Sequence, residues 1–127
     1  MTPKKPDVAL RIPADSAYLS VLRTATAGLA ARLDFTLDDI EDLRIAVDEA
    51  CAMVLPQARQ DSDLTCSFEL AETRLTVAVT AECDAPCPPD KDGFAWTVLA
   101  ALTSDVQAEV AGDTLTVTLA RGTSDAG

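Results

Sequence analysis

Acidic side chains are concentrated in the segment 38–55, which also has the periodicity of a helix. Five of them, Asp38, Asp39, Glu41, Asp42 and Asp48, could form a surface for a basic partner, because complementary charge accelerates association. The simpler interpretation is a solvated helix face whose first-turn acids complement the helix dipole, and this is what we expect for the first two of them. The six carboxylates are Asp38, Asp39, Glu41, Asp42, Asp48 and Glu49.

Cysteine is the other residue type here that could bind a metal, and the chain has four cysteines and no histidine. The lack of histidine removes histidine-based triads, metal ligands and general bases. Cys83 and Cys87 share a predicted loop, but Cys51 is expected on a helix and Cys66 on a strand. We therefore expect free thiols rather than a zinc site. A Cys83–Cys87 disulfide formed under oxidative stress is the minor alternative.

Composition excludes several classes of protein. The 127 residues are enough for one domain, and a hydrophobic content of 48% with only 4% aromatics predicts an aliphatic core. The formal net charge of −11 opposes binding to nucleic acid and to anionic membranes. Neither a signal peptide nor a transmembrane segment is recognisable, so we expect a cytoplasmic protein with reduced thiols.

Two helices are predicted in the first half of the chain. Asp15 or Ser16 is expected to cap the first helix and Thr36 the second, which ends near Leu55 because Pro56 discourages extension. Apolar residues at three- and four-residue steps predict a buried stripe on each helix. The stripes are Tyr18, Val21, Leu22, Ala25, Leu29 and Leu33 in the first helix, and Leu37, Ile40, Leu43, Val47, Ala50 and Val54 in the second.

Strands and a third helix complete the predicted order. Alternating apolar residues predict a first strand and two later hairpins, with a proline-rich loop and a helix between the hairpins. The strands are expected at residues 8–12, 64–70, 75–81, 106–110 and 115–119, the loop at 82–92 and the third helix at 93–103.

This order predicts an α/β fold: a two-layer sandwich of about five strands, in a mixed or antiparallel sheet, with three helices on one face. A single domain is expected over residues 7–120. We expect residues 1–6 to be a flexible lead-in and residues 121–127 a flexible tail.

The order of elements and three local matches resemble the bacterial anti-sigma factor serine kinases of the histidine-kinase-like ATPase superfamily, in the form found in high-GC Gram-positive bacteria. The matches are Leu33-Asp34-Phe35-Thr36, the run from Ile40 to Cys51, and Ser104-Asp105-Val106. The resemblance covers residues 8–119. It implies a histidine-kinase-like ATPase fold, an alternative sigma factor and an anti-anti-sigma factor as partners, and a homodimer.

The resemblance also implies a site, at which this sequence departs from the family pattern. Glu49 matches the general base, but Met53 stands where an asparagine helps to hold magnesium, and a thioether is a poor ligand for that ion. Ala81 and Cys83 stand where an aspartate and a glycine read the nucleotide. Gly93 alone survives from the glycine-rich lid. We therefore expect Glu49 to be a remnant base or an ordinary exposed acid, and ATP binding to be lost or weak.

Partner binding is then the expected function. Arg23 matches a family arginine that docks partners, although an internal ion pair is an equal alternative. Phe94 and Trp96 are expected in ordinary helix-to-sheet core, where they could also fill space vacated by nucleotide. Two other functions remain open. One is an active serine kinase that uses ATP and magnesium on an anti-anti-sigma factor, and the other is a degenerate subunit that pairs with an active paralogue.

Overall fold

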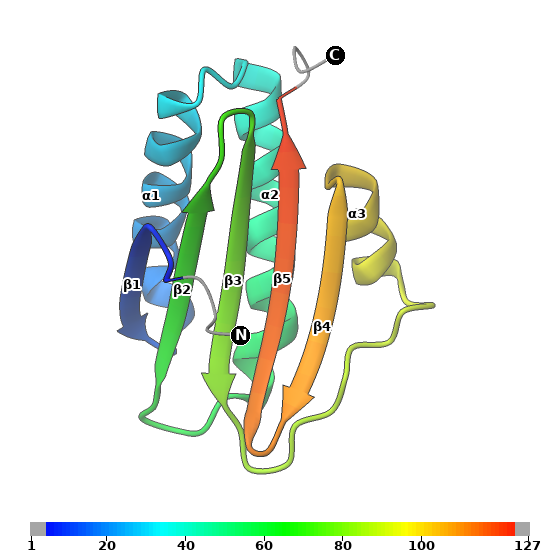
Figure 1. Cartoon of the computed structure of the whole chain (residues 1–127). Coiled ribbons are helices and arrows are strands. Elements are labelled where there is room, and N and C mark those ends of the chain that lie inside the picture. Colours follow the sequence, from blue (N-terminus) through cyan, green and yellow to red (C-terminus); the bar gives the residue numbers. More distant parts are fainter. Residues whose placement is uncertain (1–4, 124–127) are drawn as a thin grey trace.

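The chain builds one five-stranded sheet and covers one face of it with helices (Figure 1). The computed structural model describes residues 5–123. The strands are β1 (Val8–Pro13), β2 (Asp63–Leu70), β3 (Arg74–Glu82), β4 (Asp105–Ala111) and β5 (Thr114–Gly122). The helices are α1 (Leu19–Arg32), α2 (Leu37–Val54) and α3 (Phe94–Leu102), with short 3₁₀ turns η1 (Ser16–Tyr18) and η2 (Leu55–Gln57).

The strand order is β1-β2-β3-β5-β4, and every neighbouring pair is antiparallel. Because successive side chains point to opposite faces, each inner strand separates apolar from polar residues. Leu75, Val77 and Val79 of β3 are buried beneath the helices. Thr76, between the first two, and Thr80, just after the third, point to the open face. The predicted fold class is confirmed, and its sheet is antiparallel throughout.

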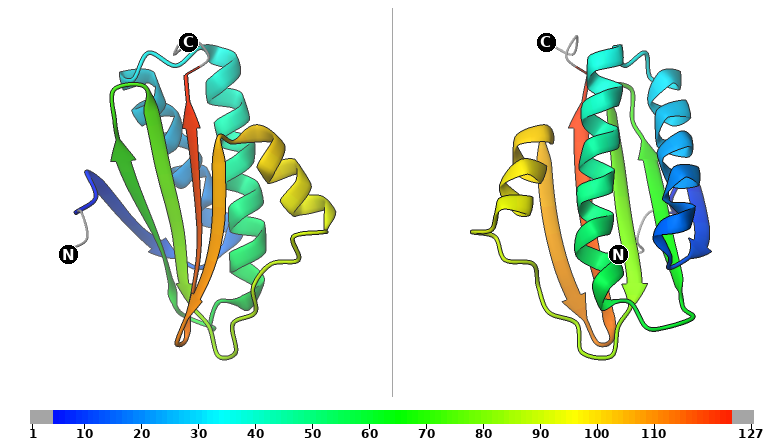
Figure 2. Two further views of the ribbon diagram at one scale, coloured as in Figure 1. Left: turned by 45° about the vertical axis from the view of Figure 1, so that its right-hand side comes forward. Right: turned by 180° about the vertical axis from the view of Figure 1, so that it is seen from behind.

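Helix α2 is the central helix of the second layer. It contacts α1 on one side and α3 on the other, and it packs across β3 and β5 (Figure 2). The predicted cap of the second helix is confirmed, because the Thr36 hydroxyl accepts the Asp39 backbone N–H at 3.1 Å. Asp15 accepts the Ala17 N–H at 2.9 Å, but it caps the turn η1 that precedes α1 rather than α1 itself. The position of α2 puts its middle turns in the core of the domain.

The predicted stripe of the first helix is partly wrong. Tyr18 and Val21 are 44% and 47% exposed, whereas Leu22, Thr26 and Ala30 are fully buried. The reason is local: the first turn is the 3₁₀ turn η1, so α1 starts only at Leu19. Residues four apart from Leu22 onward then face the core.

Two further apolar residues are also exposed, contrary to prediction. Leu37 is 82% exposed, because it is the first residue of α2 and the core-facing position of that turn belongs to Asp39. Phe94 is 84% exposed at the start of α3, of which only Leu99 is fully buried. Trp96 is half-buried and does pack against the core, as expected.

Asp39 is buried in an ion pair, so the prediction that it lies on a solvated helix face is wrong. Asp39 is 1% exposed and lies 2.8 Å from the Arg121 guanidinium. Arg121 is available because β5 continues through Gly122, paired with Arg74, two residues beyond the predicted end of the domain. Of the expected lead-in and tail, residues 1–4 and 124–127 lie outside the described range. Within that range, no helix is long and apolar enough to cross a membrane.

Candidate functional site

Glu49 and Met53, the two α2 positions singled out by the sequence, lie one helical turn apart on one face of α2. Both side chains are half-buried, and Met53 packs against the hydrophobic core. A carboxylate could act as a base for a hydroxyl placed beside it. The thioether beside it offers a soft sulfur where a hard cation needs oxygen.

Ala81 and Cys83, the two expected nucleotide-reading positions, are both buried. Ala81 is 2% exposed and Cys83 is fully buried. The Cys83 backbone N–H donates to the Asp113 carbonyl at 2.7 Å, and Cys83 also forms an isolated antiparallel bridge with Ala58. The chain just after β3 is therefore fixed on two sides by its own backbone.

Gln57 attaches the loop that follows β3 to the end of α2. Its side-chain Nε2 donates to the Cys87 carbonyl at 3.0 Å, and its Oε1 accepts the Cys87 N–H at 2.8 Å. One amide side chain thus satisfies both backbone groups of a loop residue, as a neighbouring strand would. We refer to this pair of bonds as the Gln57 clamp.

Arg59 makes a second attachment nearby, because three carboxylates surround its guanidinium. Its Nε donates to Asp84 at 2.9 Å and its Nη2 to Asp113 at 3.1 Å, while Glu82 lies 3.7 Å from its Nη1. The hydrogen bond with Asp84 is the main cause that raises the pKa of Arg59. One cation among three acids leaves an excess of negative charge at this end of the loop.

The far end of the loop closes on itself at Gly93, which caps α3. The Gly93 N–H donates to the Asp90 carbonyl at 3.0 Å, and a Cβ added at Gly93 would meet that oxygen at 3.1 Å. The lack of a side chain at Gly93 therefore allows close contact with the Asp90 backbone of the same loop. Lys91 lies over the Trp96 ring, 5.6 Å from its centroid. These residues are a poor fit to a magnesium–triphosphate group, which needs cations and open backbone N–H groups.

The acids of α2 are mostly paired within the chain. Asp39 and Asp42 both bond Arg121, at 2.8 and 3.2 Å. Asp48 lies 3.2 Å from Nε of Arg23, and Glu41 pairs with Arg44 at 2.8 Å. Asp38 is exposed, as expected. Internal pairing neutralises much of the surface that the sequence offers to a basic partner.

Arg23 therefore makes the internal ion pair that the sequence left as an alternative, between α1 and α2. Its side chain is 39% exposed and that of Asp48 is 42% exposed, so the pair lies at the surface. Exposed pairs of this kind contribute little to stability.

The cysteines are all free thiols: Cys51, Cys66 and Cys83 are buried and Cys87 is exposed. Burial, followed by the neighbouring Cys66, raises the pKa of Cys51 to about 12, and burial raises the pKa of Cys66 to about 12. Among the described residues there is no group of three or more potential metal ligands.

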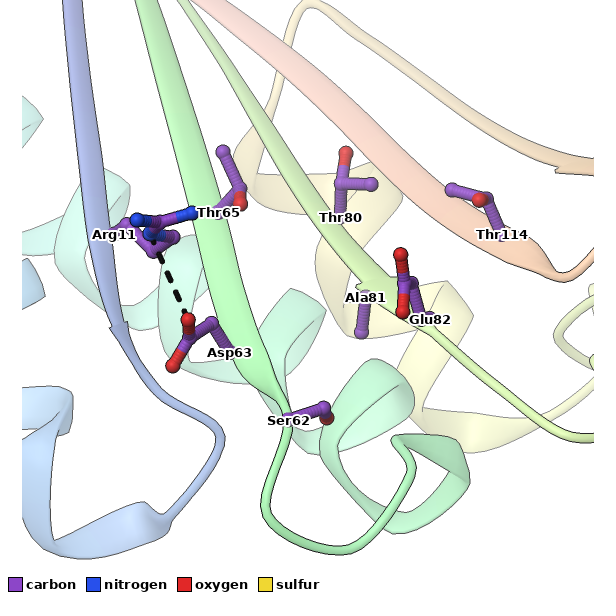
Figure 3. Close-up of a pocket in the computed structure, with 8 residues that line it drawn as sticks. All are labelled: Arg11, Ser62, Asp63, Thr65, Thr80, Ala81, Glu82 and Thr114. Carbon is purple, nitrogen blue, oxygen red and sulfur yellow. Dashed lines mark ion pairs between the residues drawn. The ribbon is translucent and has the colours of Figure 1, made fainter.

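A shallow cavity of about 350 Å³ lies on the open face of the sheet, on the side away from the helices (Figure 3). Arg11 and Asp63 form one rim, with Nε and Oδ2 3.6 Å apart, and Glu82 and Thr114 lie across from them. Of the four positions that the family pattern assigns to nucleotide binding, only Ala81 lines this cavity. The other three are Met53, Cys83 and Gly93. The cavity therefore shares only Ala81 with the site that the sequence predicts, and Glu49 does not line it.

Sequence reasoning missed Gln57 and Arg59, which lie at and just after η2. A glutamine that satisfies a backbone 30 residues away has no local sequence signature. Arg59 offered a weak signal, since it is the only cation between Arg44 and Arg74 in a strongly acidic chain.

Helices on one face of an antiparallel sheet, with a loop leading into α3 beside the central helix α2, define a two-layer α/β domain. Residues 12–120 match the family model described as histidine kinase-like ATPase domain, and the chain belongs to that family.

Curated relatives narrow the comparison. The chain is 37% identical over 81 residues to the serine-protein kinase RsbW of Bacillus velezensis. The aligned region covers 61% of this chain and 51% of the relative. It is 40% identical over 74 residues to the RsbW of Halalkalibacterium halodurans, covering 58% and 46%. The chain thus spans about half the length of the curated relatives it matches.

A solved structure supports the fold. The crystal structure of the RsbU and RsbW domains of Rv1364c from Mycobacterium tuberculosis superposes with a TM-score of 0.66 at 16% identity. The match covers 92% of this chain and 33% of that one. At this identity, the likeness concerns the fold alone.

Proposed function

We propose that this protein is a partner-switch regulator that binds an alternative sigma factor, and that its nucleotide handling is lost or weak. Its similarity to serine-protein kinases named RsbW supports the family context. The resemblance stated from the sequence implies two partners, a sigma factor and an anti-anti-sigma factor. A homodimer is part of the same proposal.

The observation that carries the proposal is the pair of Glu49 and Met53 on α2. A thioether that is half-buried against the core neither binds magnesium nor leaves the site open to it. Without the metal, the charge that develops on a transferring phosphoryl group is not neutralised. Glu49 alone does not supply phosphoryl transfer.

The loop after β3 supports the same conclusion. The Gln57 clamp and the Arg59 contacts hold the loop to the protein itself. Asp84, Asp90 and Asp92 give it negative charge, which repels phosphates. A loop that covers a triphosphate has to move and to offer cations, and this loop is fastened and acidic.

The partner surface in this proposal is centred on Arg23 of α1. Its exposed ion pair with Asp48 is weak enough to be exchanged for a carboxylate of the partner. The exposed apolar residues Tyr18 and Val21 lie on the same helix and its preceding turn, and they add contact area beside it.

Two measurements test the proposal. Isothermal titration with Mg·ATP should give no heat of binding at millimolar nucleotide. Co-purification with the sigma factors of the source organism should give a complex, which Arg23→Ala weakens and Arg32→Ala leaves unchanged. Tight nucleotide binding, or no complex with any sigma factor, contradicts the respective half of the proposal.

An active serine kinase is the second candidate, and Glu49 favours it. The Glu49 carboxylate is half-buried and, among the described residues, makes no ion pair, so it is available as a base. Transfer of labelled phosphate from ATP to an anti-anti-sigma factor, lost in Glu49→Gln and kept in Glu41→Gln, would establish this activity. Association only with an active paralogue would instead indicate a degenerate subunit.

A further inference from the structure

We propose that the free edge of β4 is a docking site for an extended, lysine- or arginine-bearing segment of a partner protein, which adds a sixth strand to the sheet. The proposal does not depend on the sigma-factor function or on nucleotide binding. It rests on the backbone of one strand and on the charges along it.

Strand β4 forms one border of the five-stranded sheet. It pairs with β5 from Asp105 to Ala111, and no other strand of the described chain lies against it. In an antiparallel pair, every second residue of an edge strand directs its N–H and C=O away from its neighbour. These groups are available to an added strand along the whole of β4.

The usual protection of such an edge is weak here. Proteins blunt edges with charged side chains, lysine above all, and with proline, bulges or a covering segment. The charged side chains of β4 are the two acids Asp105 and Glu109, which repel only an acidic strand. The sequence of β4 contains none of proline, glycine or lysine, and each of its seven residues is at least partly exposed. The opposite border differs, because β1 carries Arg11 and ends at Pro13. The two edges are thus not equivalent, and β4 is the more open.

Side chains of β4 separate by face and so prescribe the pattern of an incoming strand. Val106 and Ala108 pair with Leu119 and Val117 and pack on the helical side, where Val110 is 38% exposed. On the open face lie Asp105, Gln107 and Glu109, all exposed. An added strand places apolar side chains beside the first set and cationic ones beside the second.

Charge decides which occupant fits. From residue 105 to residue 114, β4 and its turn to β5 carry three acids, Asp105, Glu109 and Asp113, and no lysine or arginine. Asp113 already bonds Arg59, so the charge available along the edge is that of Asp105 and Glu109. Gln107 turns its amide toward Asp105 at 3.3 Å and leaves Glu109 facing solvent. A strand with lysine or arginine at alternate positions meets complementary charge along this edge.

A second copy of the chain is the poorer occupant. Antiparallel pairing of two full β4 strands would centre on Ala108 and set Gln107 opposite Glu109, with each Glu109 diagonal to its counterpart. No cation of β4 would relieve that contact. The pairing would also bring together two chains that each carry a net charge of −11.

The direct test uses a fluorescent, end-blocked heptapeptide of alternating valine and lysine and measures its anisotropy on titration with the full chain. We expect saturable binding with a Kd below about 1 mM. The matched peptide with glutamate in place of lysine should not bind. Amide hydrogen exchange should slow at alternate residues of β4 and remain unchanged in β1.

Charge-reversal variants locate the site. Glu109→Lys should weaken binding of the lysine peptide about threefold to tenfold, because an attractive cross-strand pair becomes repulsive. Glu72→Lys, an exposed change in the β2–β3 link, should have a much smaller effect. The double variant Asp105→Lys with Glu109→Lys should bind the glutamate peptide instead, which shows at the same time that the edge remains folded.

Three results would overturn the proposal. One is the absence of saturable binding at millimolar protein. Another is equal binding of the two peptides, or equal effects of Glu109→Lys and Glu72→Lys. The third is a dimer, detected by sedimentation equilibrium, whose formation slows amide exchange in β4 and which the peptide does not dissociate. A second copy of the chain would then occupy the edge.

Discussion

Nη2 of Arg121 lies 2.8 Å from Oδ1 of Asp39, so the last strand and the first turn of α2 are joined across 82 residues of sequence. The Asp39 side chain is 2% exposed and that of Arg121 is 18% exposed. Nη1 of Arg121 also donates to the Leu102 carbonyl at 2.6 Å, at the end of α3. One guanidinium therefore connects three elements.

Replacement of Asp39 by alanine should destabilise the protein by about 3 kcal/mol. Removal of one partner of a buried pair leaves the other charge without compensation. Asp42, which lies 3.2 Å from Arg121, offsets part of that loss. Urea denaturation followed by circular dichroism measures the free energy of unfolding. The matched control is Asp38→Ala, which changes an exposed acid one residue away. Equal effects of the two substitutions would contradict the structural role of the ion pair.

Replacement of Gln57 by alanine should release the loop after β3. Two hydrogen bonds to the Cys87 backbone are lost, at a cost of about 1 kcal/mol once water replaces them. Limited proteolysis should cut between residues 84 and 92 faster than in the wild type, and Tm should fall by only about 3–5 °C. Gln60→Ala, an exposed change in the adjacent turn, provides the control.

The thiols should differ sharply in reactivity. One cysteine is exposed and three are buried, so a thiol reagent near neutral pH should modify Cys87 rapidly and the others only after unfolding. Cys87→Ser should abolish the fast phase. Rapid reaction of more than one thiol in the native protein would show that the core around Cys83 opens readily.

Alkaline pH should destabilise the fold through the buried thiols. The pKa values of Cys51 and Cys66 rise from 9.0 to about 12 in the folded protein because of burial. The folded state therefore holds these protons where the unfolded state loses them. The stabilisation is complete below pH 9.0 and declines as the pH rises toward 12. The denaturation midpoint should fall less steeply over this range in a Cys51→Ala, Cys66→Ala double variant.

Truncation of two leucines of α2 should change the free energy of unfolding by very different amounts. Leu43 is fully buried, so Leu43→Ala should cost about 2–5 kcal/mol through lost contacts and a cavity. Leu37 is 82% exposed, so Leu37→Ala should change stability by less than about 0.5 kcal/mol. Thermal unfolding of both variants tests the corrected burial pattern. A large loss at Leu37 would mean that a second chain covers it in solution.

The sequence predicts the elements well because their signals are local. Period-two alternation in 75–81 and the Thr36 cap each depend on neighbours within a few residues, and both are confirmed. The burial of helix faces is less predictable. Asp39 and Leu37 exchange their expected environments, because Arg121 arrives from the far end of the chain to compensate the acid.

The candidate site is less accessible from sequence for the same reason. Residue types at Glu49 and Met53 indicate which chemistry is supported, and their position on one helix face follows from their spacing. The attachment of the loop does not follow, because Gln57 and Arg59 act on residues 25 to 54 positions away. Gln57 carries no local pattern that distinguishes it from an ordinary surface residue, and Arg59 carries only the weak signal of an isolated cation.

The position of β5 has a consequence for biosynthesis. The fifth strand in chain order lies inside the sheet, where it separates β3 from β4. While the ribosome is still making this segment, β3 has an open edge and β4 has no partner. The emerging domain therefore exposes the open edge of β3 and the whole unpaired strand β4 until residues 114–122 leave the exit tunnel. A chaperone that shields nascent strands would act in that interval, before the Arg121 guanidinium reaches α2.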